Sequence, residues 1–153
     1  MSIAVGEVAP AFELKDQHGA LRSLAEFRGR AVLVTFVPFA FTGTCTSEVC
    51  ALRDESADFV NDDVQTLVIT CDSAFTLKEW AAQQQLDYPV LSDFWPHGAV
   101  AKAYGVFNAD LGCALRGTFL VDAGGFLRWS IVNGLGEARS TDDYRSALAS
   151  LTV

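Results

Sequence analysis

The chain has 153 residues, half of them hydrophobic, and its 11 basic and 19 acidic residues give a formal net charge of −8 at pH 7. This length and apolar content fit one domain with a full core, which we expect to span residues 1–153. The acidic balance, with no cluster of lysine or arginine, argues against nucleic acid and anionic membranes as partners.

Four cysteines are too few for a disulfide scaffold, and in a reducing compartment they are more often catalytic, redox-active or buried. The N-terminal segment 1–7 has neither a basic region nor an apolar core, and no later run approaches the ~18 apolar residues of a membrane span. We therefore expect a cytoplasmic protein. With only two histidines, His18 and His97, and no paired cysteine spacing, we expect neither a metal nor a cofactor.

The first half of the chain predicts a hairpin, a buried strand and a long helix. Apolar and polar residues alternate on both sides of a turn at Gln17–Gly19, which predicts an N-terminal β-hairpin packed across one end of the domain. The β-branched apolar run Val32–Val37 predicts a central strand covered on both faces. Apolar residues at helical spacing then predict a helix from Thr44 to about Val60.

The second half continues the alternation of strands and helices. We expect a strand at Gln65–Thr70, a helix at Ala74–Gln85, a short extended piece at Pro89–Leu91 and a short helix at Gly98–Tyr104. The later elements are a strand hairpin of Thr118–Asp122 with Phe126–Val132, and a last helix through Tyr144 and Leu151 with a capping box of Ser140 and Asp143. This order is typical of a three-layer α/β fold.

Cys45 opens the helix that follows the central strand, and the helical spacing places it on the inward face. The free N–H groups and the positive dipole end of the first turn favour a thiolate there. A cysteine so placed is a candidate nucleophile; the alternative is a core thiol at a helix start.

Pro38, Thr42 and Cys45 have the spacing of a known signature, and with it the sequence resembles the peroxiredoxin family over nearly its whole length. Glu48, three residues after the cysteine, and Arg116, within Arg-Gly-Thr-Phe-Leu-Val-Asp, match further family positions. The resemblance implies a thioredoxin-like fold, with a mixed central sheet and helices on both faces. It also implies a thiol-dependent peroxidase that reduces hydrogen peroxide and organic hydroperoxides.

The resemblance implies a role for each of these residues. Arg116 would hold the thiolate and the peroxide oxygens, and Thr42 would hydrogen-bond the incoming peroxide. Pro38 would exclude water from the pocket, while Glu48 would orient the arginine. Cys45 would become a sulfenic acid that must then be reduced.

Two subgroup signals point to different ways of reducing that acid. The segments Leu91–Val100 and Ala103–Asn108 resemble the alkyl hydroperoxide reductase E group, for which an external low-molecular-weight thiol would meet the sulfenic acid. Cys50, five positions after Cys45, resembles instead the second cysteine of the Q type, also called bacterioferritin comigratory protein. Thioredoxin or a glutaredoxin-like protein (mycoredoxin) are the other implied reductants, and the resemblance also implies a homodimer.

Helix geometry sets a condition on a Cys45–Cys50 disulfide. Five positions along an α-helix place the two Cα atoms roughly 8.6 Å apart. That exceeds the ~7 Å beyond which a disulfide cannot close without backbone movement. We therefore expect this bridge to form only after the first turns of the helix unwind.

Other interpretations stay open at this point. A thioredoxin-type disulfide oxidoreductase would need two cysteines separated by two residues, which Cys45–Glu48 does not supply. A holdase with vestigial cysteines is the alternative from another class. We expect Cys71 and Cys113 to be buried fillers. Four aromatic residues are expected to form an apolar collar that suits either organic hydroperoxides or a dimer contact: Phe39, Phe41, Phe94 and Trp95.

Overall fold

Strand β3, Ala31–Phe36, lies in the middle of the fold, and all six of its side chains are buried. It is the predicted central strand, shifted by one residue. In the computed structural model, which describes residues 3–151, β3 pairs in parallel with β4, Val64–Thr70, and antiparallel with β8, Arg116–Val121. Every residue of β3 and β4 is buried, as in a sheet covered on both faces.

The sheet has seven strands in the order β2-β1-β5-β4-β3-β8-β9, with parallel and antiparallel pairs, and is therefore mixed as predicted. The remaining strands are β1 Glu13–Lys15, β2 Leu21–Ser23, β5 Val90–Ser92 and β9 Leu127–Asn133. A separate two-stranded sheet consists of β6, Phe107–Asn108, and β7, Cys113–Ala114. The helices are η1 Leu24–Phe27, α1 Gly43–Asp54, α2 Ser56–Phe59, α3 Ala74–Gln84, α4 Ala99–Ala103 and α5 Thr141–Ser150.

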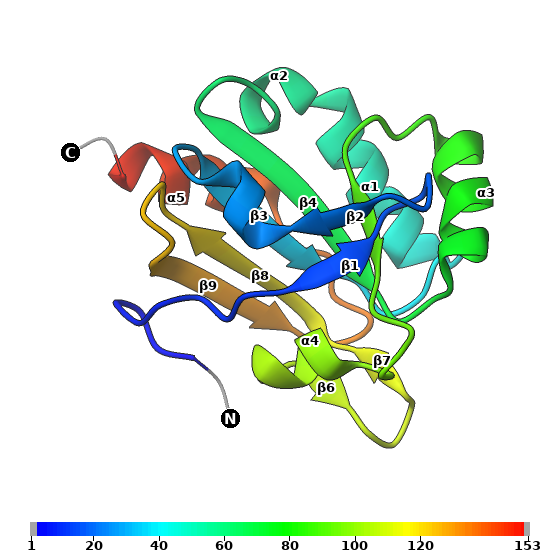
Figure 1. The fold of residues 1–153 in the computed structure, drawn as a ribbon. Helices are drawn as coiled ribbons and strands as arrows, with labels where there is room; N and C mark the ends of the chain where they lie inside the picture. The colour runs from blue at the N-terminus through cyan, green and yellow to red at the C-terminus, as the bar shows by residue number, and fades with distance from the viewer. Residues whose placement is uncertain (1–2, 152–153) are drawn as a thin grey trace.

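Helices cover both faces of the sheet. Buried residues of α1, α3 and α5, among them Val49, Trp80 and Tyr144, form one core with Leu33 of β3. On the opposite face, η1 and α4 complete a second core around Phe36 of the same strand. Figure 1 shows α4 beside the β6–β7 pair and away from α1 and α3. Side chains of β3 therefore point to both faces of the sheet and contribute to both cores.

The N-terminal hairpin is confirmed, but its position differs from the expectation. Strands β1 and β2 pair antiparallel, and Lys15 of β1 also pairs with Ser92 of β5. The hairpin therefore extends the sheet edge and does not pack across one end of it.

The predicted helix from Thr44 to Val60 is interrupted. Helix α1 ends at Asp54, Glu55 adopts φ −106° and ψ 24°, and the chain resumes as the short α2. The Glu55 carboxylate accepts hydrogen bonds from Thr141 and Arg145 of α5. The interruption therefore lies where a tertiary contact holds Glu55, which helical periodicity alone cannot reveal.

Two further local predictions differ from the structure. The Ser140 hydroxyl caps α5 by accepting a hydrogen bond from the Asp142 N–H, and not the Asp143 N–H that a capping box requires. The short β6–β7 pair was not predicted. The side chain of Asn108 accepts hydrogen bonds from the N–H groups of Asp110 and Leu111 and so organises its turn.

Candidate active site

Cys45 lies in the first turn of α1 and is fully buried. The helix starts after Thr42, whose backbone is extended and whose carbonyl accepts the hydrogen bond of the Thr46 N–H at 2.9 Å. The N–H groups of a first helical turn have no partner within the helix, so they can stabilise negative charge near them. The predicted inward orientation of Cys45 is confirmed.

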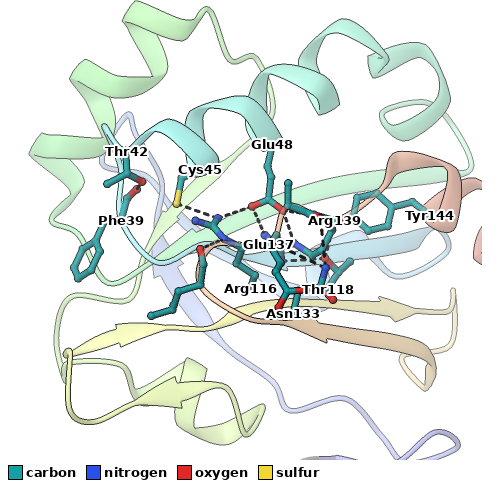
Figure 2. A network of polar contacts seen from close by, with 12 residues as sticks. Phe39, Thr42, Cys45, Glu48, Arg116, Thr118, Asn133, Glu137, Arg139 and Tyr144 are labelled. Atoms are coloured by element: carbon teal, nitrogen blue, oxygen red, sulfur yellow. Dashed lines mark hydrogen bonds and ion pairs between the residues drawn. The ribbon is translucent and has the colours of Figure 1, made fainter.

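Arg116, the first residue of β8, meets Cys45 across the interior. Its Nη1 lies 3.2 Å from the Cys45 sulfur and donates a hydrogen bond of 2.6 Å to Glu48 Oε1. Its Nε donates a hydrogen bond of 2.6 Å to the carbonyl oxygen of Leu135. Figure 2 shows Cys45 and Glu48 pointing from α1 toward this guanidinium. The structure thus brings together three of the expected site residues, which lie on two elements far apart in the sequence.

Glu48 is held from its other side by Arg139, which the sequence analysis missed. The backbone N–H and the Nε of Arg139 each donate a 2.8 Å hydrogen bond to Glu48 Oε2, and its Nη2 donates one of 2.8 Å to Oε1. Both side chains are almost fully buried. Burial would raise the pKa of Glu48, but the hydrogen bonds and charge of Arg139, with the charge of Arg116, lower it below its ordinary value.

The network continues from Arg139 into the core. Its Nη1 donates a 3.2 Å hydrogen bond to the hydroxyl of Thr118, which also hydrogen-bonds the Tyr144 hydroxyl at 2.9 Å. Arg139 precedes α5 in a loop, and 91 positions separate it from Glu48. A lone arginine before a helix does not by itself predict such a contact. The only signal in the sequence is indirect: a buried Glu48 needs a positive partner, and Arg139 supplies it.

Thr42 and Pro38 belong to the loop between β3 and α1. Pro38 is buried, whereas Thr42 is exposed and its hydroxyl donates a 2.8 Å hydrogen bond to the carbonyl oxygen of Phe39. The loop is tied to the neighbouring β4–α3 connection, because the Ala40 N–H donates a 2.8 Å hydrogen bond to an Asp72 carboxylate oxygen. Both residues therefore lie in a fixed turn leading to Cys45.

Cys50 lies on a different side of α1 from the site network. It is half-buried, and its thiol donates a 3.3 Å hydrogen bond to the Gln84 side chain of α3. Arg53, one turn later, donates a 2.7 Å hydrogen bond to the Gln84 carbonyl oxygen. The four cysteines are free, and Cys45 and Cys50 lie within one continuous helix. The structure therefore does not bring these two cysteines together.

Two of the four collar aromatics line a groove away from Cys45. Phe94 and Trp95, with Phe75 of α3, border a cavity of about 860 Å³ next to the β1–β2 hairpin. Trp95 is 81% exposed.

Within residues 3–151, no helix is long and apolar enough to cross a membrane. In the same residues, no group of three or more histidine, cysteine, aspartate or glutamate side chains could hold a metal ion.

A buried cysteine at a helix N-terminus, hydrogen-bonded to a buried arginine, lies on a mixed sheet covered by helices, and this arrangement is that of a protein built around one thiol site. The family model described as the AhpC/TSA family matches residues 5–130. Alkyl hydroperoxide reductase E of Mycobacterium tuberculosis is 48% identical over 150 residues, covering 97% of this chain and 98% of that protein. A putative peroxiredoxin of Synechocystis is 32% identical over 151 residues, covering 92% of this chain and 74% of that protein.

Solved structures agree with these relatives. Mycobacterium tuberculosis AhpC matches with a TM-score of 0.86 at 27% identity over the full length of both chains. Peroxidoxin BcpB of the same organism matches with a TM-score of 0.86 at 28% identity, covering 97% of this chain and 98% of that one. The chain therefore belongs to the AhpC/TSA family, has the thioredoxin-like fold of peroxiredoxins, and is a thiol-dependent peroxidase.

Proposed function

We propose that Cys45 is the peroxidatic cysteine and that it reduces hydrogen peroxide and organic hydroperoxides. The observation that carries this proposal is the 3.2 Å contact between Arg116 Nη1 and the Cys45 sulfur in a fully buried site. A guanidinium so placed stabilises the thiolate by a charge-assisted hydrogen bond. The name of the mycobacterial relative, an alkyl hydroperoxide reductase, supports organic hydroperoxides as substrates.

In the proposed reaction the Cys45 thiolate attacks the distal oxygen of the hydroperoxide, the O–O bond breaks, and an alkoxide or hydroxide leaves. Negative charge moves from sulfur to both oxygens, so fixed donors around that bond lower the barrier. Arg116 supplies one donor, and the N–H groups of Thr44 and Cys45 supply others. Thr42 turns its hydroxyl from Phe39 to the incoming peroxide.

Pro38 and Glu48 have supporting roles in this proposal. Pro38 excludes water from the pocket, in keeping with its burial at the end of β3. Glu48 orients Arg116, because its carboxylate binds the same Nη1 that meets the Cys45 sulfur. The sulfenic acid left on Cys45 is then the species to be reduced.

For that reduction we propose a Cys45–Cys50 disulfide, formed after the first turns of α1 unwind. The half-buried position of Cys50, beside Gln84 at the end of α3, supports access of a protein reductase to the disulfide once formed. Thioredoxin or a glutaredoxin-like mycoredoxin would reduce it. The alternative is direct reduction of the sulfenic acid by a low-molecular-weight thiol.

A trapping experiment tests the proposed chemistry. Pre-reduced protein treated with one equivalent of peroxide in the presence of dimedone should carry the adduct on Cys45, and without dimedone it should show the Cys45–Cys50 bridge in mass spectra. Adducts on another cysteine would overturn the assignment of Cys45. A protein whose cysteines do not react with peroxide, but which reduces insulin disulfides, would favour the thioredoxin-type alternative.

We also propose that the protein works in the cytoplasm, as one domain and as a homodimer. The expected domain limits, 1–153, extend at both ends beyond the described residues.

Exposed aromatics such as Phe94, Trp95 and Phe75 support a dimer contact, because a large exposed apolar patch marks an interaction site. Sedimentation analysis of Trp95→Lys beside wild type tests it: the variant should be monomeric, and an unchanged mass would refute this surface.

A further inference from the structure

Arg116 and Thr118 occupy alternate positions of β8 and therefore point to the same face of the sheet. Both are buried. On this face Arg116 meets Cys45 and Glu48. Thr118 accepts the 3.2 Å hydrogen bond from Arg139 Nη1 (Figure 2). One strand thus carries both the arginine that contacts the sulfur and an anchor for the second arginine.

The hydrogen bonds of these residues close a ring. Glu48 Oε1 accepts from Arg116 Nη1 at 2.6 Å and from Arg139 Nη2 at 2.8 Å. Arg139 then returns to β8 through Thr118. Because both arginines share one carboxylate oxygen, a displacement of the Arg139 guanidinium moves an acceptor that Arg116 also uses. The same Nη1 of Arg116 lies 3.2 Å from the Cys45 sulfur, so the displacement reaches the site.

The side chain of Arg139 has no access to water that could replace Thr118, because it is 0% exposed. Its Nε and Nη2 bind Glu48, and among the described residues Nη1 has only the Thr118 hydroxyl as a hydrogen-bond acceptor. A buried charged donor without an acceptor costs free energy, and a guanidinium relieves that cost by moving toward another acceptor. The Thr118 hydroxyl therefore fixes where the Arg139 guanidinium lies.

Tyr144 of α5 holds the Thr118 hydroxyl in turn. The two hydroxyl oxygens lie 2.9 Å apart. Burial raises the pKa of Tyr144, so its hydroxyl keeps its proton and can donate it to Thr118. A hydroxyl oxygen has two lone pairs and can accept from Tyr144 and Arg139 together. The ring of Tyr144 packs edge-on against Phe59 and Trp129, so α5 presents the hydroxyl from a fixed position.

A threonine on the neighbouring strand offers a contrast. Thr35 of β3 is the register partner of Thr118 in the antiparallel pair, so the two side chains lie on the same face. Thr35 is fully buried as well, but its hydroxyl has no hydrogen-bond partner among the described residues. The same residue type in the same layer is therefore part of the network at one position and not at the other.

We propose that Thr118 and Tyr144 are positioning residues of the peroxidase site. They hold the Arg139–Glu48 pair and thereby set the direction of the Arg116 donor toward the sulfur. This inference rests on the proposed peroxidatic role of that sulfur. It makes α5, which does not itself contact the sulfur, part of what determines the rate of peroxide reduction.

The first test makes the same substitution at two buried threonines. Thr118→Val removes the hydroxyl that binds Arg139, whereas Thr35→Val removes one that the described part of the chain leaves unpaired. The second-order rate constant with hydrogen peroxide, measured by stopped flow, should fall by about 10-fold in Thr118→Val, since a hydrogen bond to a charged group is lost. It should stay unchanged in Thr35→Val. Thr118→Ser keeps the hydroxyl and should recover most of the rate.

A second pair of variants tests the α5 end. Tyr144→Phe removes the hydroxyl that meets Thr118, and Tyr104→Phe removes one that donates a 2.8 Å hydrogen bond to the Pro10 carbonyl oxygen. Both tyrosines are buried, so the two variants should lose similar stability in urea. Only Tyr144→Phe should react more slowly with peroxide, by about 3-fold, because a neutral hydrogen bond is weaker than a charged one.

A measurement that does not depend on activity separates this inference from the proposed function. The buried Nε–H groups of Arg116 and Arg139 should give resolved side-chain NMR signals, because they donate hydrogen bonds of 2.6 Å and 2.8 Å. Thr118→Val should shift the Arg116 signal, and Thr35→Val should leave it in place.

Each other outcome has a distinct meaning. A rate constant of Thr118→Val equal to that of wild type would overturn the inference, whatever the variant loses in stability. An equal fall in Thr35→Val would also overturn it, because the packing of the strands would then matter and not the hydroxyl. A wild type that consumes no peroxide would refute the proposed function; a shifted Arg116 signal in Thr118→Val would still support the positioning, and an unshifted one would refute that too.

Discussion

Arg116 makes three contacts that only a guanidinium can combine: the sulfur of Cys45, the carboxylate of Glu48 and the carbonyl of Leu135. A lysine there would keep the charge but not the planar set of donors. For Arg116→Lys we expect the second-order rate constant with hydrogen peroxide to fall by about 10²-fold, the loss typical of one transition-state donor. Stopped-flow kinetics would measure it, and a rate equal to wild type would show that the arginine is not part of the reaction.

Arg139 acts through Glu48 and is a positioning residue. Replacing it with methionine removes one side of a buried ion pair, and such changes cost about 3–5 kcal/mol of folding free energy. For Arg139→Met we expect a clear loss of stability in urea unfolding and a smaller loss of peroxide reactivity than for Arg116→Lys. Arg139→Lys should recover part of the reactivity. A peroxide rate constant of Arg139→Met equal to that of wild type would mean that Glu48 holds Arg116 without help from Arg139.

At the residue scale, the part of the site that could be predicted from the sequence is the part that lies in recognisable motifs. Cys45 lies in one short signature with Pro38 and Thr42, and Arg116 lies in a recognisable stretch, so the contact between Cys45 and Arg116 could be expected. Arg139 could not, because its contact with Glu48 depends on how α5 packs on the sheet. A buried ion pair between distant loops leaves no pattern in a single sequence.

At the scale of elements, α1 holds the cysteine pair in a geometry that the proposed disulfide must break. The helix is continuous from Gly43 to Asp54. We expect hydrogen exchange of the α1 amides to be faster in the peroxide-oxidised wild type than in oxidised Cys50→Ser, which cannot form the bridge. Equal protection of α1 in the two proteins would contradict unwinding as a step in resolution.

The elements themselves were largely predictable, because long apolar runs and helical spacing dominate the chain. The exceptions are local. Helix α1 stops where Glu55 binds α5, and the β6–β7 pair depends on the Asn108 turn and on the contact of His97 with the Gly112 carbonyl oxygen at 2.6 Å. In each case a tertiary or turn contact overrides the periodic pattern.

At the scale of the whole molecule, the lowered pKa of Glu48 links folding to pH. Its contribution to stability is complete above the ordinary glutamate pKa of about 4.3 and is lost as the pH falls through the lower folded-state value. For Glu48→Gln we expect a loss of about 3 kcal/mol near neutral pH. Urea unfolding across pH should show the gap between wild type and variant closing below about pH 4. A gap that does not depend on pH would mean that the Glu48 charge is not what stabilises the fold.

The central claim is that the sulfur of Cys45 breaks the O–O bond. Its most direct test is a single-turnover measurement, in which pre-reduced protein is mixed with excess hydrogen peroxide and no reductant is added. We predict a rapid burst that consumes one equivalent of peroxide per chain in wild type, and no such burst in Cys45→Ser. A burst of wild-type size in Cys45→Ser would contradict the account.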